Sequence, residues 1–335
     1  MPVALVSALA IGLVGCGSSN DAGNESGGPS AGSKVSGSLT IDGSGTVFPI
    51  GAALAEMFNA SNPDVNITVG NAGTGAGFEK FAKGEIEISN ASRPVKDSEL
   101  KKLQEAGVEF YELPVAYDGL CIIIHPSNTW LKSITLEQLN KIWDKDSKVK
   151  MWSDVDPTWP KQEIKLYGAT SAHGTYEYFN EVVNGDKENV RADYSQQAEY
   201  DPLIQGVANE PSALGYVGYA YALDNASRVK TIPIDSGKGA ITPSEATILD
   251  GSYAPFSRPL MMYVSKKAYD SNPAVKAFTE FALTAEGGEA VKAAGYVPLA
   301  SDTLMLIQAR LQAGRTGSIL SGADSTKSLI ELFKS

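Results

Sequence analysis

Histidine and cysteine are scarce in this chain, which has two of each among its 335 residues. It contains no HExxH, CxxC or GxxxxGK[ST] pattern. With so few histidines and thiols, a metal centre would have to be built from carboxylates. We therefore expect no metal, no cofactor and no enzymatic activity.

Positive charge is also in short supply. The 28 Lys and Arg residues are outnumbered by 39 Asp and Glu residues, the formal net charge is −11, and the basic residues form no run. This argues against nucleic acid or an anionic membrane surface as a partner. A small anion is still possible, because local dipoles and one cation can oppose the global field, which salt screens over about 8 Å.

The N-terminal residues lack charge. Met1–Gly15 is a mostly apolar run, shorter than the roughly 20 residues that span a bilayer, and is typical of a secretory signal peptide. It ends in Leu13-Val14-Gly15-Cys16, which resembles a bacterial lipobox and implies cleavage before Cys16 and diacylation of its sulfur. An ordinary secretory signal or a weak transmembrane anchor is the alternative. The run departs from the usual signal pattern, because no Lys or Arg precedes Lys34 and the positive n-region is missing. We expect a protein of the cell envelope, anchored by lipid outside the cytoplasmic membrane, on its periplasmic or extracellular face.

Residues 17–37 are rich in Gly and Ser and have almost no apolar side chains. They predict a flexible tether over residues 16–37, after a signal peptide over residues 1–15. Only Cys121 then remains as a thiol, so the mature domain has no intrachain disulfide. Because Cys121 lies in the apolar run Leu120–Ile124, we expect it to be a buried small hydrophobe.

One local pattern occurs four times: a β-rich run, a loop of small polar residues, and an amphipathic helix. A helix N-terminus has unpaired N–H groups and the positive end of the helix dipole, while glycines allow an oxyanion to come close. Four such loops in one chain predict convergence on a shared anionic ligand. They are Asp42–Pro49 (DGSGTVFP), Val69–Phe81 (VGNAGTGAGFEKF), Ile88–Pro94 (ISNASRP) and Leu166–Phe179 (LYGATSAHGTYEYF).

Strands and helices alternate along the chain, which predicts an α/β fold with a largely parallel sheet and ligand loops at one edge. The length favours two lobes. Two extended segments, Tyr111–Pro126 and Pro259–Ser265, enclose material that reads as a separate lobe. Hydrophobic spacing predicts helices over residues 47–58, 78–83, 135–143, 274–284 and 286–294, one capped by Asp97, and strands over 39–41, 65–69 and 85–89. Residues 304–311 and 329–333 are helical in character, but no place is assigned to 301–335.

From Ser38 to Ala300 the chain resembles the phosphate-binding proteins of bacterial ABC phosphate uptake systems. The resemblance implies the type II periplasmic-binding-protein fold, with two lobes, each a mixed sheet flanked by helices, and the ligand in the cleft between them. Lobe 1 would comprise residues 38–117, lobe 2 residues 118–258, and the return to lobe 1 with the C-terminal segment residues 259–335. The motifs that carry it are DGSGTVFP at Asp42, GTGAGF at Gly73, SNASRP at Ser89, YDGL at Tyr117, WSDV at Trp152, HGTYEYF at His173 and ALGYVGYAY at Ala213.

The implied function is capture of inorganic phosphate and its delivery to an ABC permease, by a monomer. The alternatives are a binder of another tetrahedral oxyanion (sulfate, molybdate or arsenate) and a secreted phosphatase or phosphate-sensing protein. Selection against sulfate would need an acceptor for the phosphate proton, because sulfate has no proton to give.

The resemblance also implies a set of phosphate-binding residues. Hydroxyl and backbone N–H groups would come from the four loops, with Arg93 as the cation. The chain departs from the family pattern twice: Arg93 stands where some relatives have a carboxylate, and the fourth loop reads Ala-His-Gly-Thr where Asp-Ser-Gly-Thr is usual. The implied residues are Ser44, Thr46, Val47, Thr74, Gly75, Ser92, Arg93, His173, Gly174 and Thr175.

Several of these residues have simpler interpretations. The guanidinium of Arg93 suits a tetrahedral oxyanion, but it could instead form a salt bridge with a carboxylate. The threonines are also favoured as helix caps. His173 could accept the phosphate proton, which would make affinity depend on pH near 6.5, or pack at the cleft rim. Asp118 could orient Arg93, accept the ligand proton or serve the hinge.

Overall fold

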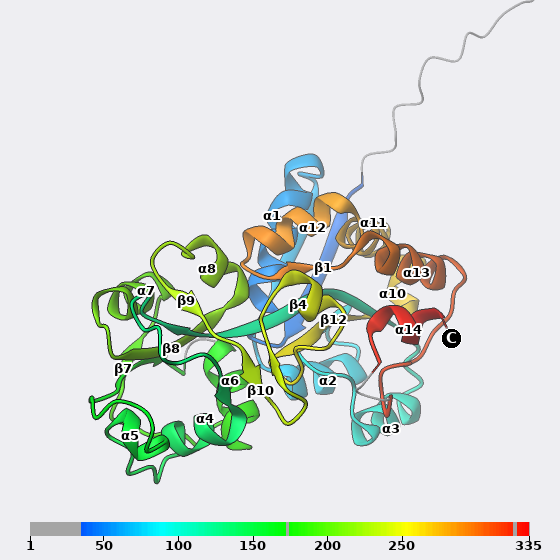
Figure 1. Ribbon diagram of the computed structural model, residues 1–335. Coiled ribbons are helices and arrows are strands. Elements are labelled where there is room, and N and C mark those ends of the chain that lie inside the picture. The colour runs from blue at the N-terminus through cyan, green and yellow to red at the C-terminus, as the bar shows by residue number, and fades with distance from the viewer. Residues whose placement is uncertain (1–34, 172–173, 324–326, 335) are drawn as a thin grey trace, which may run out of the picture. The chain divides into compact units, whose positions relative to one another are not determined.

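One continuous mixed sheet runs through the fold (Figure 1). The computed structural model describes residues 35–171, 174–323 and 327–334, and the chain from Val35 on forms one compact unit. The strand order is β2 (Val65–Val69), β1 (Gly37–Gly43), β3 (Ile88–Ala91), β12 (Ser257–Ser265), β4 (Phe110–Ile124), β8 (Ala213–Gly218), β6 (Lys165–Ala169) and β7 (Ser195–Gln197), with β9 (Lys230–Thr231) and β13 (Val297–Pro298) also pairing with β4. Strand β1 pairs in parallel with β2 and β3, whereas β12 is antiparallel to both β3 and β4.

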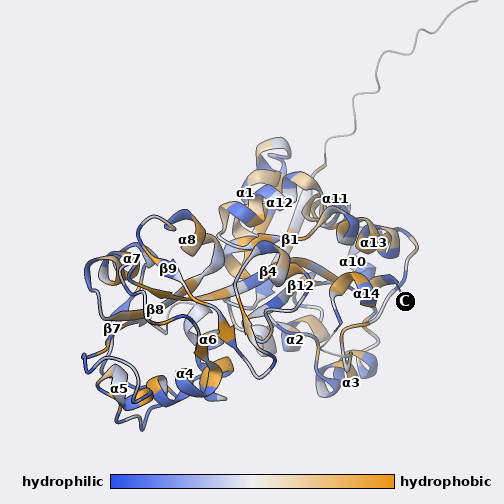
Figure 2. Cartoon of the chain, in the orientation of Figure 1, coloured by the Kyte–Doolittle hydropathy of each residue, from blue (hydrophilic) through white to orange (hydrophobic). Residues whose placement is uncertain are grey.

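Strand β4 joins the two parts of this sheet. All of its residues are buried. Most of them are hydrophobic (Figure 2), as expected of a strand that is covered on both faces. Residues 110–119 pair with β12, and from Leu120 on the partner changes to β8. The two extended segments singled out in the sequence are therefore neighbouring strands, and the mixed α/β architecture with a large sheet is confirmed. The residue boundaries of the lobes stay a prediction.

One group of helices comes from the segments that connect β1 to β4 and from the C-terminal part of the chain. Helix α1 starts where Pro49 occupies its first turn, a position that needs no N–H donor. Helix α2 begins at Thr74 instead of the predicted Phe78, because Gly73, at φ 98°, ends the preceding loop. These helices are α1 (Phe48–Ser61), α2 (Thr74–Ala82), α3 (Asp97–Glu105), α10 (Lys266–Ser271), α11 (Pro273–Ala282), α12 (Ala285–Ala293), α13 (Ser301–Gln312) and α14 (Leu329–Lys334).

The segment between the two crossing strands has its own helices and a small sheet. Helix α4 begins at Leu136, one residue after the predicted start. Thr135 is its N-cap, and the Thr135 hydroxyl accepts a hydrogen bond from the Gln138 N–H. The elements are α4 (Leu136–Trp143), α5 (Trp152–Val155), α6 (Gly174–Asn184), α7 (Tyr200–Asn209), α8 (Tyr219–Asp224) and α9 (Glu245–Leu249), with strands β5 (Ile134–Thr135), β10 (Ile234–Asp235) and β11 (Ala240–Ile241).

Small differences from the predicted boundaries have local causes. Gly37, predicted to end the tether, opens β1 and pairs with Val65. Asp97 is the first residue of α3 and not its cap, because the Glu99 carboxylate accepts a hydrogen bond from the Lys96 N–H at 2.9 Å and so caps the helix. The signal peptide, Cys16 and His173 lie outside the described residues. Within the described ranges, no helix is both long and apolar enough to cross a membrane.

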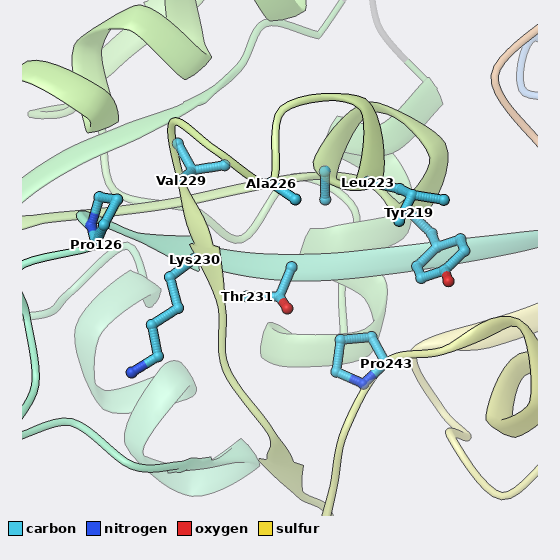
Figure 3. Close-up of a pocket in the computed structure, with 9 residues that line it drawn as sticks. Pro126, Tyr219, Leu223, Ala226, Val229, Lys230, Thr231 and Pro243 are labelled. Atoms are coloured by element: carbon cyan, nitrogen blue, oxygen red, sulfur yellow. The ribbon is translucent and has the colours of Figure 1, made fainter.

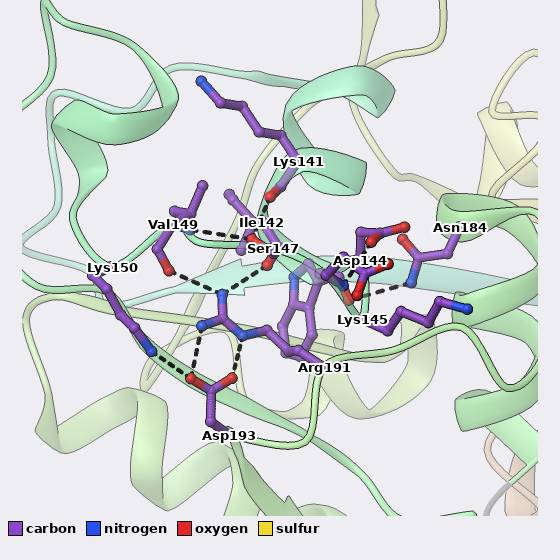
Figure 4. A network of polar contacts seen from close by, with 12 residues as sticks. Lys141, Ile142, Asp144, Lys145, Ser147, Val149, Lys150, Asn184, Arg191 and Asp193 are labelled. Atoms are coloured by element: carbon purple, nitrogen blue, oxygen red, sulfur yellow. Dashed lines mark hydrogen bonds and ion pairs between the residues drawn. The ribbon is translucent and has the colours of Figure 1, made fainter.

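Aromatic side chains fill the core around α4 and α6. Trp143 and Trp152 are fully buried, and the rings of Phe179 and Tyr216 stack with centroids 3.8 Å apart. These two tryptophans belong to the core. Beside them, the buried Arg191 donates to the carbonyls of Ile142 and Val149 and pairs with Asp193 (Figure 4).

The C-terminal segment, which had no place in the predicted fold, lies along β4. The Gly317 N–H donates to the Phe110 carbonyl at 2.8 Å. The buried carboxylate of Glu112 accepts hydrogen bonds from the backbone N–H groups of Ile319 and Leu320, at 2.8 and 3.0 Å. Glu112 thus provides hydrogen-bond acceptors for two backbone N–H groups of a segment about 200 positions further along the chain.

Candidate functional site

Asp42, at the end of β1, ties the first two glycine loops together. Its carboxylate accepts hydrogen bonds from the N–H groups of Gly43 (2.7 Å) and Ala72 (2.9 Å), and it forms an ion pair with Lys80 of α2. Burial alone would raise the pKa of Asp42, but the bonds from Ala72, Lys80 and Gly43 outweigh it and hold that pKa below its ordinary value. The first loop is thereby held against the second.

The third loop is joined to the first through β3. The Ser44 N–H donates to the Asn90 carbonyl at 2.9 Å. Gly43 has φ 134°, and a Cβ at this position would lie 2.2 Å from the Asn90 oxygen. Only glycine permits this approach of the first loop to β3.

Thr74 and Ser92 bring the second and third loops face to face. Their hydroxyl oxygens lie 3.3 Å apart, and the Ser92 N–H points to the Thr74 oxygen at 3.4 Å. Both residues are half-buried, and Gly75, in the first turn of α2, is exposed. The structure therefore brings these predicted donors together at the start of α2.

The fourth loop meets the first at Thr46. A Cβ at Gly174 would lie 2.7 Å from Thr46 Oγ1, so α6 starts directly against the Thr46 side chain. The next residue, Thr175, is buried, and its hydroxyl forms a hydrogen bond with the Tyr200 hydroxyl. The backbone of Thr46 is also held in place, because the Tyr296 hydroxyl donates a hydrogen bond to the Thr46 carbonyl at 2.7 Å. Pairwise contacts thus join the four loops: the first loop contacts the second, the third and the fourth, and the second contacts the third.

Two predicted donors have partners within the protein. The Val47 N–H, at the start of α1, donates to the Ser44 carbonyl at 3.1 Å. The Arg93 guanidinium forms a bidentate ion pair with Glu99, at 2.7 and 2.8 Å, and donates to the Pro94 carbonyl at 3.1 Å. Burial would raise the pKa of Glu99, but its bond with Arg93 contributes to a net lowering. The structure therefore gives Arg93 the salt bridge that was its alternative interpretation.

Arg258, which was not predicted from the sequence, places its guanidinium against Thr46. Its Nη2 lies 3.4 Å from Thr46 Oγ1 and 3.3 Å from Asp118 Oδ2. Its guanidinium carbon lies 3.6 Å from the centre of the Tyr178 ring, in cation–π contact. Asp118 thus pairs with Arg258 and not with Arg93. Arg258 was missed because it lies outside the glycine loops, immediately before the predicted extended run; an arginine at the edge of an apolar strand was the available signal.

The arrangement has the chemistry of an oxyanion site. Hydroxyl donors and the starts of α1, α2 and α6 belong to loops that are joined by direct contacts, and one guanidinium, that of Arg258, contacts Thr46. In the described part of the chain, no cluster of His, Cys, Asp and Glu residues has the grouping needed to hold a metal ion.

Two other hollows lie away from these loops. One, of about 410 Å³, is bordered by α8 and β9 and by Pro126 and Pro243 (Figure 3). The other, of about 370 Å³, includes Lys83, Lys266 and Lys267 in its lining. Neither contains a residue predicted to bind the ligand.

Comparison with known proteins gives consistent matches. The model of the PBP superfamily domain family matches residues 28–286. The phosphate-binding protein PstS of Staphylococcus saprophyticus is 38% identical over 297 residues, which cover 88% of each chain. The crystal structure of a possible phosphate-binding protein from Planctomyces limnophilus has 41% identity and a TM-score of 0.79, over 84% of this chain and 99% of the other. A putative phosphate ABC transporter substrate-binding protein from Clostridium perfringens, solved with bound phosphate, has 26% identity and a TM-score of 0.56, over 79% of this chain and 100% of the other.

Proposed function

The chain belongs to the PBP superfamily, and on that premise we propose that it is the phosphate-binding component of an ABC importer. Its relatives support this assignment, since the Staphylococcus protein is named as phosphate-binding and the Clostridium structure contains phosphate. They are binding proteins by name, which favours transport over catalysis. The same relatives favour an extracytoplasmic location.

The observation that carries the proposal is the set of contacts that joins the four loops, with Arg258 against Thr46. Hydrogen bonds with a charged partner contribute about 1.5 to 3 kcal/mol each. Micromolar affinity corresponds to about −8 kcal/mol. A few directed donors and one guanidinium are therefore enough to hold a phosphate, including the cost of ordering the site.

We assign the ligand contacts as the sequence predicts, with one addition. The donors are Ser44, Thr46, Thr74, Gly75, Ser92, Gly174 and Thr175, with Val47 and His173 as further predicted contacts. The positive charge would come from Arg93 or from Arg258, the residue added here because it contacts Thr46. Binding would draw together the loops on both sides of β4 in a two-state closure.

The finer parts of the proposal concern the cell envelope. Cys16 would carry the lipid anchor, the tether would let the folded unit reach a permease in the cytoplasmic membrane, and the protein would act as a monomer. A Cys16→Ser variant that still fractionates with membranes would contradict the lipid anchor.

Calorimetric titration of the unit from Val35 to Ser335, stripped of ligand, tests the binding function. We expect phosphate to bind with micromolar or tighter affinity and sulfate to give no heat. Binding of sulfate, molybdate or arsenate in preference to phosphate would assign a different oxyanion. Release of phosphate from a phosphomonoester would identify the protein as a phosphatase instead.

A further inference from the structure

Glu112 is a buried carboxylate that joins two distant parts of the chain. It lies on β4, is 1% exposed, and is the register partner of Tyr263 on β12. Its Oε1 accepts hydrogen bonds from the hydroxyls of Tyr263 (2.8 Å) and Ser318 (2.5 Å), and its Oε2 accepts from the N–H groups of Ile319 (2.8 Å) and Leu320 (3.0 Å). A charged carboxylate at this depth is costly unless its oxygens are bonded, and these four uncharged donors supply the bonds.

Tyr263 extends this set of hydrogen bonds to the third loop, Ile88–Pro94. Its hydroxyl oxygen accepts a hydrogen bond from the Val95 N–H at 2.9 Å, and Val95 directly follows the loop. Burial raises the pKa of Tyr263 well above its ordinary value, so the hydroxyl keeps its proton and donates it to Glu112. The bonds therefore run in one direction, from Val95 through Tyr263 to Glu112.

A second contact links the C-terminal segment, here residues 317–321, to the same region. The Ser321 hydroxyl donates to the carboxylate of Asp97, the first residue of α3, at 3.2 Å. Two residues further on, Glu99 holds Arg93 of the third loop in a bidentate ion pair. Segment 317–321 thus reaches the end of the third loop by two routes, one through β4 and β12 and one through the start of α3.

Segment 317–321 has the features of a part that opens locally. Residues 312–315 before it are exposed, and residues 316–319 are half-buried. Leu320 is the buried apolar side chain of the segment, at 6% exposure. Hydrogen bonds to Glu112 therefore make up much of its attachment, and such segments open at a lower free energy than the strands beneath them.

We propose that Glu112 and Tyr263 couple segment 317–321 to the third loop, so that phosphate binding at the loop and docking of the segment on β4 strengthen each other. The proposal rests on the phosphate-binding function given above, in which Ser92 is a ligand contact. The docked segment fixes the Glu112 carboxylate, which orients the Tyr263 hydroxyl toward the Val95 N–H. Glu112 and Tyr263 are positioning residues, since neither is among the proposed ligand contacts.

Reciprocity gives this coupling a signature that a purely structural role would lack. If the docked segment favours phosphate binding, phosphate must favour the docked segment by the same factor. Phosphate should therefore slow hydrogen exchange at the N–H groups of Ile319 and Leu320. The reference is the Ser147 N–H, which donates to the Asp144 carbonyl in the segment between the crossing strands and reports any general stabilisation by the ligand.

The first test measures this exchange in the unit from Val35 to Ser335, with and without saturating phosphate. In the unaltered protein we expect phosphate to slow exchange at 319 and 320 more than at Ser147. Tyr263→Phe keeps the ring and removes the hydroxyl, so this additional slowing should be lost. Calorimetry should show that the variant binds phosphate roughly 2- to 30-fold more weakly, the usual effect of a change within a coupling network.

The second test starts from the other end of the network. Ser318→Ala removes a hydroxyl from segment 317–321 alone, at a half-buried position, and should also weaken phosphate binding, by roughly 2- to 30-fold. Ser318→Thr keeps the hydroxyl and should restore the affinity. The matched control is Tyr269→Phe, which removes another tyrosine hydroxyl that donates to a carboxylate, that of Glu280, at 2.8 Å, and should leave the phosphate affinity unchanged.

Thermal unfolding of each variant identifies any that fail to fold, and Ser318→Ala carries the test if Tyr263→Phe is one of them. Wild-type phosphate affinity in both variants would overturn the proposal. Phosphate-dependent slowing at 319 and 320 that is as large in a folded Tyr263→Phe as in the unaltered protein would also overturn it. Absence of phosphate binding in the unaltered protein would instead overturn the proposed function, and this coupling with it.

Discussion

Gly174 packs against Thr46 so closely that a Cβ on residue 174 would lie 2.7 Å from the Thr46 hydroxyl oxygen and 2.9 Å from its Cα. This contact joins a loop that follows β1 to a helix that follows β6, two elements from different halves of the sheet. The distance between the first and fourth loops is therefore set by the absence of one side chain.

Gly174→Ala should push these loops apart. Overpacking at a site that cannot relax costs about 1 to 3 kcal/mol, and here the cost falls on the arrangement that holds the ligand. We expect weaker phosphate binding by calorimetry with a smaller change in the melting temperature. Gly288→Ala is the control, because its Cβ would meet only Pro298 at an ordinary 3.6 Å. Equal phosphate affinities of the Gly174→Ala and Gly288→Ala variants would mean that the contact between Gly174 and Thr46 plays no part in binding.

Arg191 should be important for stability and irrelevant to the ligand. It is 5% exposed and donates to the carbonyls of Ile142 (2.8 Å) and Val149 (3.1 Å) as well as to Asp193 (Figure 4). Arg191→Met leaves those carbonyls without a donor, at about 1 to 3 kcal/mol each, so urea unfolding should show a clearly lower free energy of unfolding. Lys150→Met, which removes the exposed partner of Asp193, should cost less than about 1 kcal/mol. The reverse order of the two variants would contradict this account.

Asp42 should make stability depend on pH in the acid range. Its pKa is lowered in the folded protein below the ordinary 3.8, so the folded state binds fewer protons than the unfolded state between the two pKa values. The stabilisation is then fully present above about pH 4 and is lost as the pH falls through the folded pKa. In urea unfolding, Asp42→Asn should have a lower free energy of unfolding than the wild type at pH 6, and this difference should be smaller at pH 3. A difference that does not change with pH would show that the Asp42 charge is not the source of the stabilisation.

Glu112 should hold the C-terminal segment on β4. Its carboxylate accepts bonds from the Tyr263 hydroxyl, from Ser318 Oγ and from the Ile319 and Leu320 N–H groups, so Glu112→Ala removes four acceptor contacts at once. We expect faster hydrogen exchange at 319 and 320 and a loss of about 1 to 3 kcal/mol of stability. Exposed Glu289→Ala is the control. Unchanged exchange in the Glu112 variant would mean that other contacts hold this segment.

Cys121 should be unreactive in the folded protein. It is completely buried on β4, and burial, together with the nearby Asp118 charge, raises the pKa of its thiol. Iodoacetamide should label the unit from Val35 only after denaturant has unfolded it. Rapid labelling under native conditions would show that β4 opens locally at this point.

The elements that follow from local physics were predictable. A strand, a glycine loop and an amphipathic helix are encoded within about fifteen residues, so the loops at Thr46, Thr74 and Gly174 were found from the sequence, with helix ends wrong by a few positions. Cys121 was assigned to the core because its neighbours are apolar, and it is fully buried.

The long-range pairings could not be predicted in the same way. Arg258 and Asp118 are 140 positions apart and meet only because β12 and β4 are in register. A preference for Arg93 was reasonable from its loop, but its partnership with Glu99 depends on where α3 begins. The position of the C-terminal segment likewise depends on Glu112, a residue of β4 that shows no local sign of its partners.

The sequence by itself determined the α/β class, the oxyanion-type loops and the family resemblance, since these depend on residue types at short spacing. Only the tertiary structure decided which cation reaches Thr46, which carboxylate faces it and how closely Gly174 approaches. The physical reason is that strand register and packing between distant elements set those distances, and no local pattern of residues contains them.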